Sequence, residues 1–176
     1  MKSNIALIGF MGVGKTVVGE ALAKKLNWEF IELDSLIEQK AGKTIPEIFQ
    51  QDGEMVFREL EIEVTKEVSQ RQNAVTACGG GIVLNQINID RLRQKSRIVY
   101  LTASPAVILQ RILGDGGERP LLKVANPAPT IQELLRFRRP FYERAADMKI
   151  NTSKLSVDAV AEQIIERLKQ DEGLNS

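Results

Sequence analysis

An eight-residue glycine-rich segment, Gly9-Phe-Met-Gly-Val-Gly-Lys-Thr16, limits the possible folds of this chain more than any other stretch. It follows an apolar run at Asn4–Ile8 that is typical of a buried strand, and a segment with helical spacing comes after it. The pattern is G-x-x-x-x-G-K-[ST], whose glycines let the backbone curl until successive N–H groups converge on phosphate oxygens. A glycine-rich turn that happens to precede a helix is the alternative. In this context the motif predicts a loop that binds a nucleoside triphosphate.

The residue types of this loop define the roles that we expect. The Lys15 ammonium reaches the β- and γ-phosphates, the Thr16 hydroxyl ligates Mg²⁺, and the helix N-terminus adds positive potential. The sequence therefore predicts nucleotide contacts at Gly12, Val13, Gly14, Lys15, Thr16 and Val17.

The rest of the chain alternates between short β-rich runs and segments long enough for helices. Such alternation predicts an α/β fold of three layers, in which helices cover both faces of a parallel sheet. A chain of 176 residues can bury a substantial core, so we expect a single domain over residues 1–176. The predicted strands are Asn4–Ile8, Glu29–Leu33, Ala74–Cys78, Ile98–Leu101 and Met148–Asn151.

Several helix boundaries are marked by polar residues. Capping-box patterns predict helix starts at Thr44 and Thr130, and Ser156 precedes a last helix over Val157–Lys169. Asp52-Gly53 divides one long helical region into two.

Two segments, Gly114–Pro120 and Asn126–Pro129, do not fit the alternating pattern, because both are rich in turn formers and poor in apolar periodicity. We expect a mobile flap, or lid, over Leu113–Ala125. A short polar tail is expected over residues 170–176.

Charge balance and the lack of histidine exclude several classes of function. The 24 basic and 23 acidic side chains leave a net charge of +1, which favours neither nucleic acid nor an anionic membrane surface as a partner. Without histidine there is no Ser-His-Asp or Cys-His machinery, so acid–base chemistry falls to carboxylates or lysine. The single cysteine, Cys78, cannot form an internal disulfide, which predicts a cytoplasmic protein. The longest apolar stretch, Ile5–Gly14, is about ten residues, too short to span a membrane, and lacks a signal-peptide cleavage pattern.

A magnesium ion beside the phosphates needs an acidic partner. The third, fourth and fifth predicted strands do not end in an acidic residue, whereas Glu32 and Asp34 lie at the carboxyl end of the second. Their spacing of two places both carboxylates on one face of an extended chain. By elimination we expect them to serve the metal or the phosphoryl acceptor. The alternatives are that Asp34 caps a helix over Ser35–Ala41 and that Glu32 is a solvated strand end.

Arg138 falls within the apolar side of a predicted helix. At about 100° per residue from Leu134, it lies near 40°, among Phe137, Phe141 and Ala145. A buried guanidinium without a partner is costly, so we expect Arg138 to line a pocket and bind an anion. The alternative is that Pro140 distorts the helix and lets Arg138 reach water. Its neighbours Arg136 and Arg139 point away and are expected on a solvated face.

Three further features are weaker signals when each is taken alone. Arg58 follows Glu54 by four residues, which is the spacing of an ordinary surface ion pair. Gly79-Gly80-Gly81 follows the third strand, where it is either a flexible turn or exposed backbone for a bulky ligand. Arg119 lies in the predicted flap and could reach a γ-phosphoryl group from there.

Together these features resemble the shikimate kinase family along nearly the whole chain. The resemblance rests on the glycine-rich loop, Asp34, Phe57-Arg58, Gly79-Gly-Gly81, Arg119-Pro-Leu-Leu122, and Arg138 with Pro140 and Tyr142. Only the loop is specific by itself, but the combination separates this family from adenylate, gluconate and other small P-loop kinases. The resemblance implies a nucleoside-monophosphate-kinase-like fold with a five-stranded parallel sheet of order 2-3-1-4-5.

The resemblance also implies a reaction, in which the γ-phosphoryl group of MgATP passes to the 3-hydroxyl of shikimate. It implies that Arg58 and Arg138 hold the shikimate carboxylate and that Asp34 and the glycine triplet hold its hydroxyls. Arg119 would close over the site with the lid. Arg111, at the start of the lid, and the segment that includes Asn151 and Lys154 would border the nucleotide.

From this we expect Lys15, Asp34 and Arg119 to act in catalysis, with ATP and shikimate as the partners of a monomer. Mg²⁺ would be bound by Thr16 and, through water, by Glu32 and Asp34. Glu32 stands where family members commonly have Asp, and water-mediated contacts would tolerate its extra methylene. A kinase for another small hydroxylated acid and a non-catalytic nucleotide-binding regulatory module are the alternatives.

Overall fold

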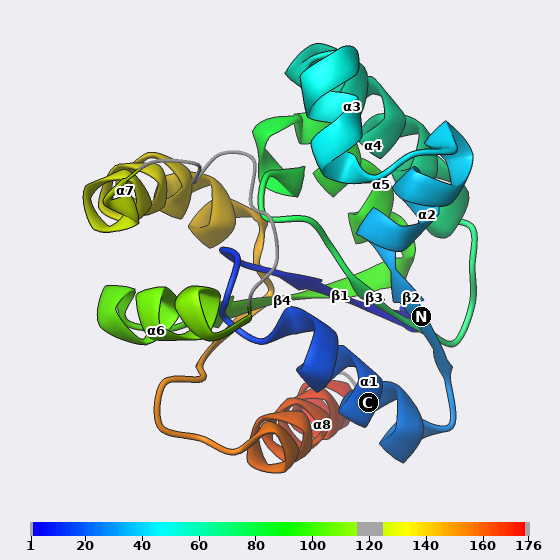
Figure 1. The fold of residues 1–176 in the computed structure, drawn as a ribbon. Helices are drawn as coiled ribbons and strands as arrows, with labels where there is room; N and C mark the ends of the chain where they lie inside the picture. The colour runs from blue at the N-terminus through cyan, green and yellow to red at the C-terminus, as the bar shows by residue number, and fades with distance from the viewer. Residues whose placement is uncertain (1, 116–124, 175–176) are drawn as a thin grey trace.

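A five-stranded parallel sheet forms the middle layer of the computed structural model, which describes residues 2–115 and 125–174 (Figure 1). The order across the sheet is β2-β3-β1-β4-β5, as predicted. The strands are β1 (Asn4–Ile8), β2 (Glu29–Glu32), β3 (Ala74–Ala77), β4 (Ser96–Thr102) and β5 (Met148–Asn151).

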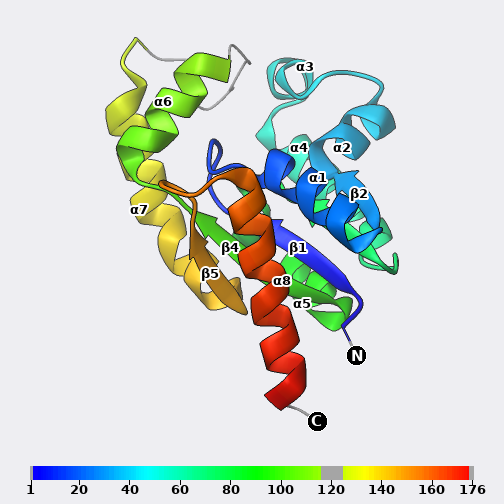
Figure 2. The ribbon, with the colours of Figure 1, turned by 90° about the horizontal axis from the view of Figure 1, so that it is seen from below.

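Helices cover both faces of this sheet, which confirms the predicted three-layer α/β fold (Figures 1 and 2). One face is covered by α1 (Lys15–Leu26) and α8 (Val157–Leu174). The other is covered by α4 (Glu54–Val68), α5 (Gln86–Lys95) and α7 (Pro127–Ala145). The remaining helices are α2 (Leu33–Ala41) and α3 (Ile45–Gln51), which pack on α4, then α6 (Pro105–Asp115), which packs on α7, and the short 3₁₀ helix η1 (Ile82–Leu84).

The central strand β1 is buried on both of its faces. Ile5 and Leu7 pack in the cluster on the α1 and α8 side, whereas Ala6 and Ile8 pack in the cluster on the α4 and α5 side. Successive side chains of a strand point to opposite faces, so a strand covered on both sides must be apolar throughout. This explains why an unbroken apolar run precedes the glycine-rich loop.

Because all pairings are parallel, the carboxyl ends of the strands meet at one edge of the sheet. The glycine-rich loop leaves β1 there, next to the glycine triplet that follows β3. Ligands of open parallel sheets bind at this edge, where the strand order reverses.

Polar helix signals were confirmed at several positions. The Thr44 hydroxyl accepts a hydrogen bond from the backbone N–H of Glu47, and the Glu47 carboxylate accepts one from the backbone N–H of Thr44, so the capping box is complete. The hydroxyl of Ser156 accepts from the N–H of Ala159, and Asp52-Gly53 separates α3 from α4.

Other predicted boundaries were wrong. Helix α7 begins at Pro127 and is capped by Asn126, so Thr130 lies inside the helix. Proline suits the first turn of a helix, because its missing N–H would have no partner there. Strand β2 ends at Glu32, and α2 begins at Leu33, so Asp34 lies in the first helical turn rather than at an N-cap or in extended chain.

The remaining differences concern the lengths of elements. Strand β3 ends one residue earlier than predicted, and β4 is longer at both ends because its backbone pairs with β1 and β5. Helix α6 continues to Asp115, so the first residues of the predicted flap are helical, and the flap's residues 116–124 lie outside the described residues. Helix α8 continues to Leu174, where a polar tail was expected.

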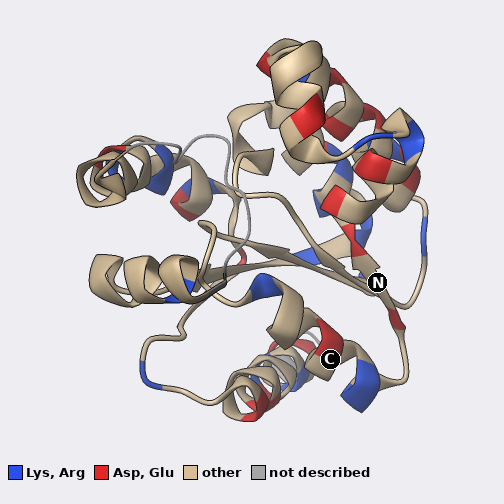
Figure 3. Ribbon diagram, in the orientation of Figure 1, with Lys and Arg blue, Asp and Glu red and all other residues tan. Residues whose placement is uncertain are grey.

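Charged residues of both signs are interspersed over the helices, whereas the sheet consists mostly of other residue types (Figure 3). Over residues 2–115 and 125–174, the longest and most apolar helices fall short of what crossing a bilayer requires.

Gly9 and Gly42 offer a matched test of this packing, because both have positive φ, at 147° and 70°. A Cβ on Gly9 would lie 2.4 Å from the carbonyl oxygen of Leu101 in β4, whereas a Cβ on Gly42 would meet nothing within 4 Å. We expect Gly42→Ala to lower the free energy of unfolding by about 1–2 kcal/mol, from backbone strain alone. Gly9→Ala should cost about 1–3 kcal/mol more, from the clash with backbone. Urea unfolding of both variants measures the difference, and equal losses would contradict this packing of β1 against β4.

Candidate active site

The glycine-rich loop has the backbone that a phosphate-binding loop needs. Gly9, Gly12 and Gly14 all have positive φ, which L side chains rarely adopt. Lys15 begins α1, and its ammonium donates to the carbonyl oxygens of Gly9 at 2.7 Å and Phe10 at 2.9 Å. The Lys15 side chain therefore lies across the glycine-rich loop.

The Thr16 hydroxyl and the Glu32 carboxylate meet beside this loop. The hydroxyl donates to Oε2 of Glu32 at 2.7 Å. Burial raises the pKa of Glu32 and the negative charge of Asp34 raises it further, while the hydrogen bond from Thr16 and the charge of Lys15 lower it. The Thr16 hydroxyl, the Glu32 carboxylate and the Lys15 ammonium therefore lie close together at the carboxyl ends of β1 and β2.

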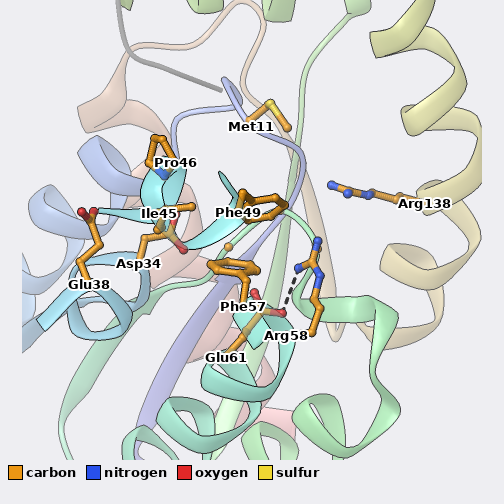
Figure 4. A pocket seen from close by; sticks show the side chains of 13 residues that line it. Met11, Asp34, Glu38, Ile45, Pro46, Phe49, Phe57, Arg58, Glu61 and Arg138 are labelled. Carbon is orange, nitrogen blue, oxygen red and sulfur yellow. Dashed lines mark hydrogen bonds and ion pairs between the residues drawn. The ribbon is translucent and has the colours of Figure 1, made fainter. Parts of the chain in front are cut away.

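A pocket of about 250 Å³ adjoins the loop (Figure 4). Its walls combine apolar and aromatic side chains with charged groups of both signs. The lining residues are Met11, Asp34, Glu38, Ile45, Pro46, Phe49, Phe57, Arg58, Glu61, Gly79, Gly80, Gly81 and Arg138.

Two guanidinium groups face this pocket from different helices, Arg58 from α4 and Arg138 from α7 (Figure 4). Arg138 is only 3% exposed, and among the described residues its Nε has no hydrogen-bond partner. Its guanidinium carbon lies 5.9 Å from the ring centre of Phe10. The expected burial of Arg138 is confirmed, and Pro140 does not carry it into water. A buried cation in a pocket wall favours an anionic ligand.

Arg58 both forms an ion pair and lines the pocket. The ion pair is the predicted one with Glu54, with Nη2 and Oε1 3.2 Å apart. A Cβ on Gly81 would lie 2.3 Å from Nη1 of Arg58, so the absence of a side chain there gives the guanidinium its place.

The other two glycines of the triplet bring the pocket against the loop. A Cβ on Gly80 would lie 3.5 Å from the backbone nitrogen of Met11, and one on Gly79 would lie 3.1 Å from Oδ1 of Asp34. The buried Tyr142 hydroxyl donates to the carbonyl oxygen of Gly80, which holds the triplet in place. The close approaches favour a role for the triplet as pocket wall over a freely flexible turn.

Glu61 belongs to this site, although it was not predicted. It is fully buried, its Oε1 accepts from Nη1 of Arg58 at 3.0 Å, and within the described parts of the chain its Oε2 has no hydrogen-bond partner. Burial raises its pKa to about 7, against the lowering effect of Arg58. The signal was present in the sequence, because Phe57, Glu61, Val64 and Val68 follow the spacing of one buried helix face.

The predicted nucleotide neighbours lie beyond the other side of the loop. Arg111 on α6 donates to the carbonyl oxygens of Gly12 and Val13, at 3.3 and 3.2 Å. Asn151 ends β5, where its Oδ1 accepts from the N–H of Ser153, and Lys154 is exposed in the turn that follows. Thr152 lies between them, within the segment expected to border the nucleotide, but no role of its own was predicted for it.

Most of the remaining predicted residues are exposed. Arg136 and Arg139 are exposed, as expected. Phe137 is 61% exposed, so its expected place on the apolar side of α7 was wrong, because Ile131, Leu135 and Tyr142 define the buried side instead. Val17 is exposed at the start of α1, and Arg119 lies outside the described residues.

Glu61 should make stability depend on pH. Its pKa of about 7 in the folded protein exceeds the ordinary 4.5, so the folded state binds this proton more tightly. The free energy of unfolding should therefore fall as pH rises from about 4.5 to about 7, by roughly 3 kcal/mol at about 1.36 kcal/mol per pH unit. Glu61→Gln should remove this part of the slope in urea unfolding between pH 4.5 and pH 8. Glu54→Gln, which changes the exposed partner of Arg58, should keep the slope, and an unchanged slope in Glu61→Gln would exclude the assignment.

The sequence of this chain is similar to those of known shikimate kinases. A family model described as shikimate kinase matches residues 11–169. A shikimate kinase of Caldanaerobacter subterraneus subsp. tengcongensis is 46% identical over 162 residues, 92% of this chain and 94% of the relative. One of Thermodesulfovibrio yellowstonii is 46% identical over 167 residues, 95% of each chain.

The structure of this chain is also similar to solved structures of shikimate kinases. Shikimate kinase from Acinetobacter baumannii, in complex with shikimate, has a TM-score of 0.92 and 38% identity, covering 97% of this chain and 95% of that one. The enzyme from Aquifex aeolicus has a TM-score of 0.83 and 35% identity, covering 96% and 98%. A gluconokinase from Sinorhizobium meliloti, at 19% identity and a TM-score of 0.61, shares the fold alone. By family model, sequence and structure, the chain belongs to the shikimate kinase family.

Proposed function

We propose that this chain transfers the γ-phosphoryl group of MgATP to the 3-hydroxyl of shikimate, which yields ADP and shikimate 3-phosphate. The observation that carries the proposal is that Arg58 and Arg138 face one pocket whose glycine wall touches the phosphate-binding loop. We also propose that the chain acts as a monomer.

The acceptor would lie in the pocket with its carboxylate between the two guanidinium groups. Charge-assisted hydrogen bonds to a carboxylate are strongest where water is largely excluded, and Arg138 is 3% exposed. Asp34 and the backbone of Gly79–Gly81 would bind the hydroxyls, because they line the side of the pocket nearest the loop. This directs a hydroxyl toward the phosphate site.

The donor site fits ATP and a magnesium ion. The loop and Lys15 would hold the phosphates, and Asn151, Lys154 and Arg111 would border the rest of the nucleotide. Thr16 would ligate Mg²⁺ directly, and Glu32 and Asp34 would hold its water ligands, since the metal prefers oxygen donors. When bound, the ion would neutralise charge on the phosphoryl oxygens.

Catalysis would depend on position and charge. The acceptor oxygen attacks the γ-phosphorus, the bond to the β–γ bridging oxygen breaks, and ADP leaves. Lys15 balances the negative charge on the phosphates. Asp34 orients the hydroxyl and is the proposed acceptor of its proton, because the chain has no histidine. Arg119 lies outside the described residues. Its role as the arginine that closes over the γ-phosphoryl group is a prediction from the sequence.

A coupled assay of ADP release tests the reaction. With ATP and Mg²⁺ we expect turnover with shikimate and none above background with gluconate or water as acceptor. The paired arginines select an acid over water, and selection against gluconate, which also carries a carboxylate, depends on the shape of the pocket. Turnover with gluconate alone would indicate a kinase for another hydroxylated acid, and nucleotide binding without turnover would indicate a regulatory module.

Arg138 and Arg136 form a matched pair on α7, one buried in the pocket and one exposed. Arg138→Ala should raise the KM for shikimate about 10- to 100-fold, because a charged hydrogen bond of about 1.5–3 kcal/mol is lost, and the KM for ATP should change little. Arg136→Ala should leave both constants near those of the unmodified protein. Steady-state kinetics with each substrate varied would reject the pocket assignment if the KM for shikimate stayed constant in Arg138→Ala.

A further inference from the structure

Two residues outside the phosphate-binding loop hold its carbonyl groups. Thr152 follows β5, and Arg111 lies on α6, so they come from parts of the chain distant in sequence from the loop. The hydroxyl of Thr152 lies 2.8 Å from the carbonyl oxygen of Val13. The guanidinium of Arg111 donates to the same oxygen and to that of Gly12. Helix α6 also packs against the loop, since a Cβ on Gly12 would lie 3.1 Å from Ile112 (Figure 1).

Thr152 is buried and hydrogen-bonded on several sides where it contacts the loop. It is 3% exposed, its N–H donates to the carbonyl oxygen of Thr102 at 2.7 Å, and its own carbonyl accepts from Nη2 of Arg111 at 3.1 Å. Its hydroxyl accepts from Nη1 of Arg111 at 3.1 Å. The carbonyl oxygens of Val13 and Thr102 lie 2.8 and 3.1 Å from the Thr152 hydroxyl. The hydroxyl has a single proton to donate, and the shorter distance favours the carbonyl oxygen of Val13 as its acceptor. Thr152 therefore connects the loop to the carboxyl end of β4.

Fixing a carbonyl fixes the neighbouring N–H group. In a planar trans peptide, the C=O of one residue and the N–H of the next point in opposite directions. If Thr152 and Arg111 hold the carbonyls of Gly12 and Val13 toward β5 and α6, the N–H groups of Val13 and Gly14 point away from those elements. In a loop of this kind, converging N–H groups are what bind phosphate.

We infer that Thr152 is a positioning residue for the phosphoryl donor, whose hydroxyl orients the Val13–Gly14 peptide so that its N–H can bind a nucleotide phosphate. The inference rests on the proposed function only in taking ATP as the donor. It assigns Thr152 no contact with substrate, because it acts through Val13.

The test compares side chains that differ in the hydroxyl. Thr152→Val keeps the shape and removes the hydroxyl, Thr152→Ala removes it without risk of a steric clash, and Thr152→Ser keeps it. Thr65→Val is the matched control, since the Thr65 hydroxyl is also buried and donates to a carbonyl oxygen, that of Glu61 in α4. Calorimetric titration with ADP and Mg²⁺, without acceptor, measures nucleotide binding directly, and kinetics give the KM for each substrate.

We expect Thr152→Val and Thr152→Ala to weaken ADP binding about tenfold, the effect of one buried hydrogen bond, and to raise the KM for ATP but not for shikimate. Thr152→Ser should bind within about twofold of the unmodified protein. Thr65→Val should lose stability without losing nucleotide affinity, which separates a local role from general destabilisation.

Unchanged ADP affinity in the folded hydroxyl-free variants would overturn the inference, as would a loss that Thr152→Ser shared. Equal losses for ATP and shikimate would overturn it too, because they would indicate a general defect. Failure of the proposed function would look different, because the unmodified protein would bind ADP but show no turnover with shikimate. In that case the ratio of ADP affinities between the variants would still decide the role of Thr152.

Discussion

The burial of β1 between β3 and β4 is the constraint on which the site depends. A central parallel strand covered on both faces can end at only one edge of the sheet, so the loop that follows it emerges beside the loops after its neighbours. The glycine triplet after β3 therefore lies against the phosphate-binding loop, with only backbone at the contact near Met11. The proposed donor site and the pocket beside it are therefore neighbours at one edge of the sheet.

The two arginines in the wall of the pocket beside the loop differ in their ion pairing. Arg58 shares its guanidinium between Glu54 and the buried Glu61, whereas Arg138 is buried beside Phe10 and Tyr142. Desolvation makes a buried cation costly, so a pocket with Arg138 in its wall favours an anionic ligand. The raised pKa of Glu61 reflects the same desolvation acting on a carboxyl group.

How much of this could be predicted differed from residue to residue. Local patterns were sufficient for the glycine-rich loop, for the capping box at Thr44 and for the burial of Arg138, because each depends on neighbours within a turn or two. The start of α7 was misjudged, because Asn126 and the prolines after it were interpreted as turn formers, whereas they form the N-cap and the first turn of the helix. Asp34 was expected in extended chain, but α2 begins as soon as β2 ends.

Sequence was thus enough to establish the phosphate-binding loop, the α/β alternation and the absence of histidine chemistry, since these are properties of single segments and of composition. The partners of each group were decided by the packing of distant segments. Glu61 meets Arg58 within one helix, but its burial requires the sheet and the glycine triplet beside it. Thr152 and Arg111 reach the carbonyls of Val13 and Gly12 across more than ninety residues of chain. Hydrogen bonds of such range leave no periodic signal in the sequence, because they depend on the parallel register that brings the ends of β1, β4 and β5 together.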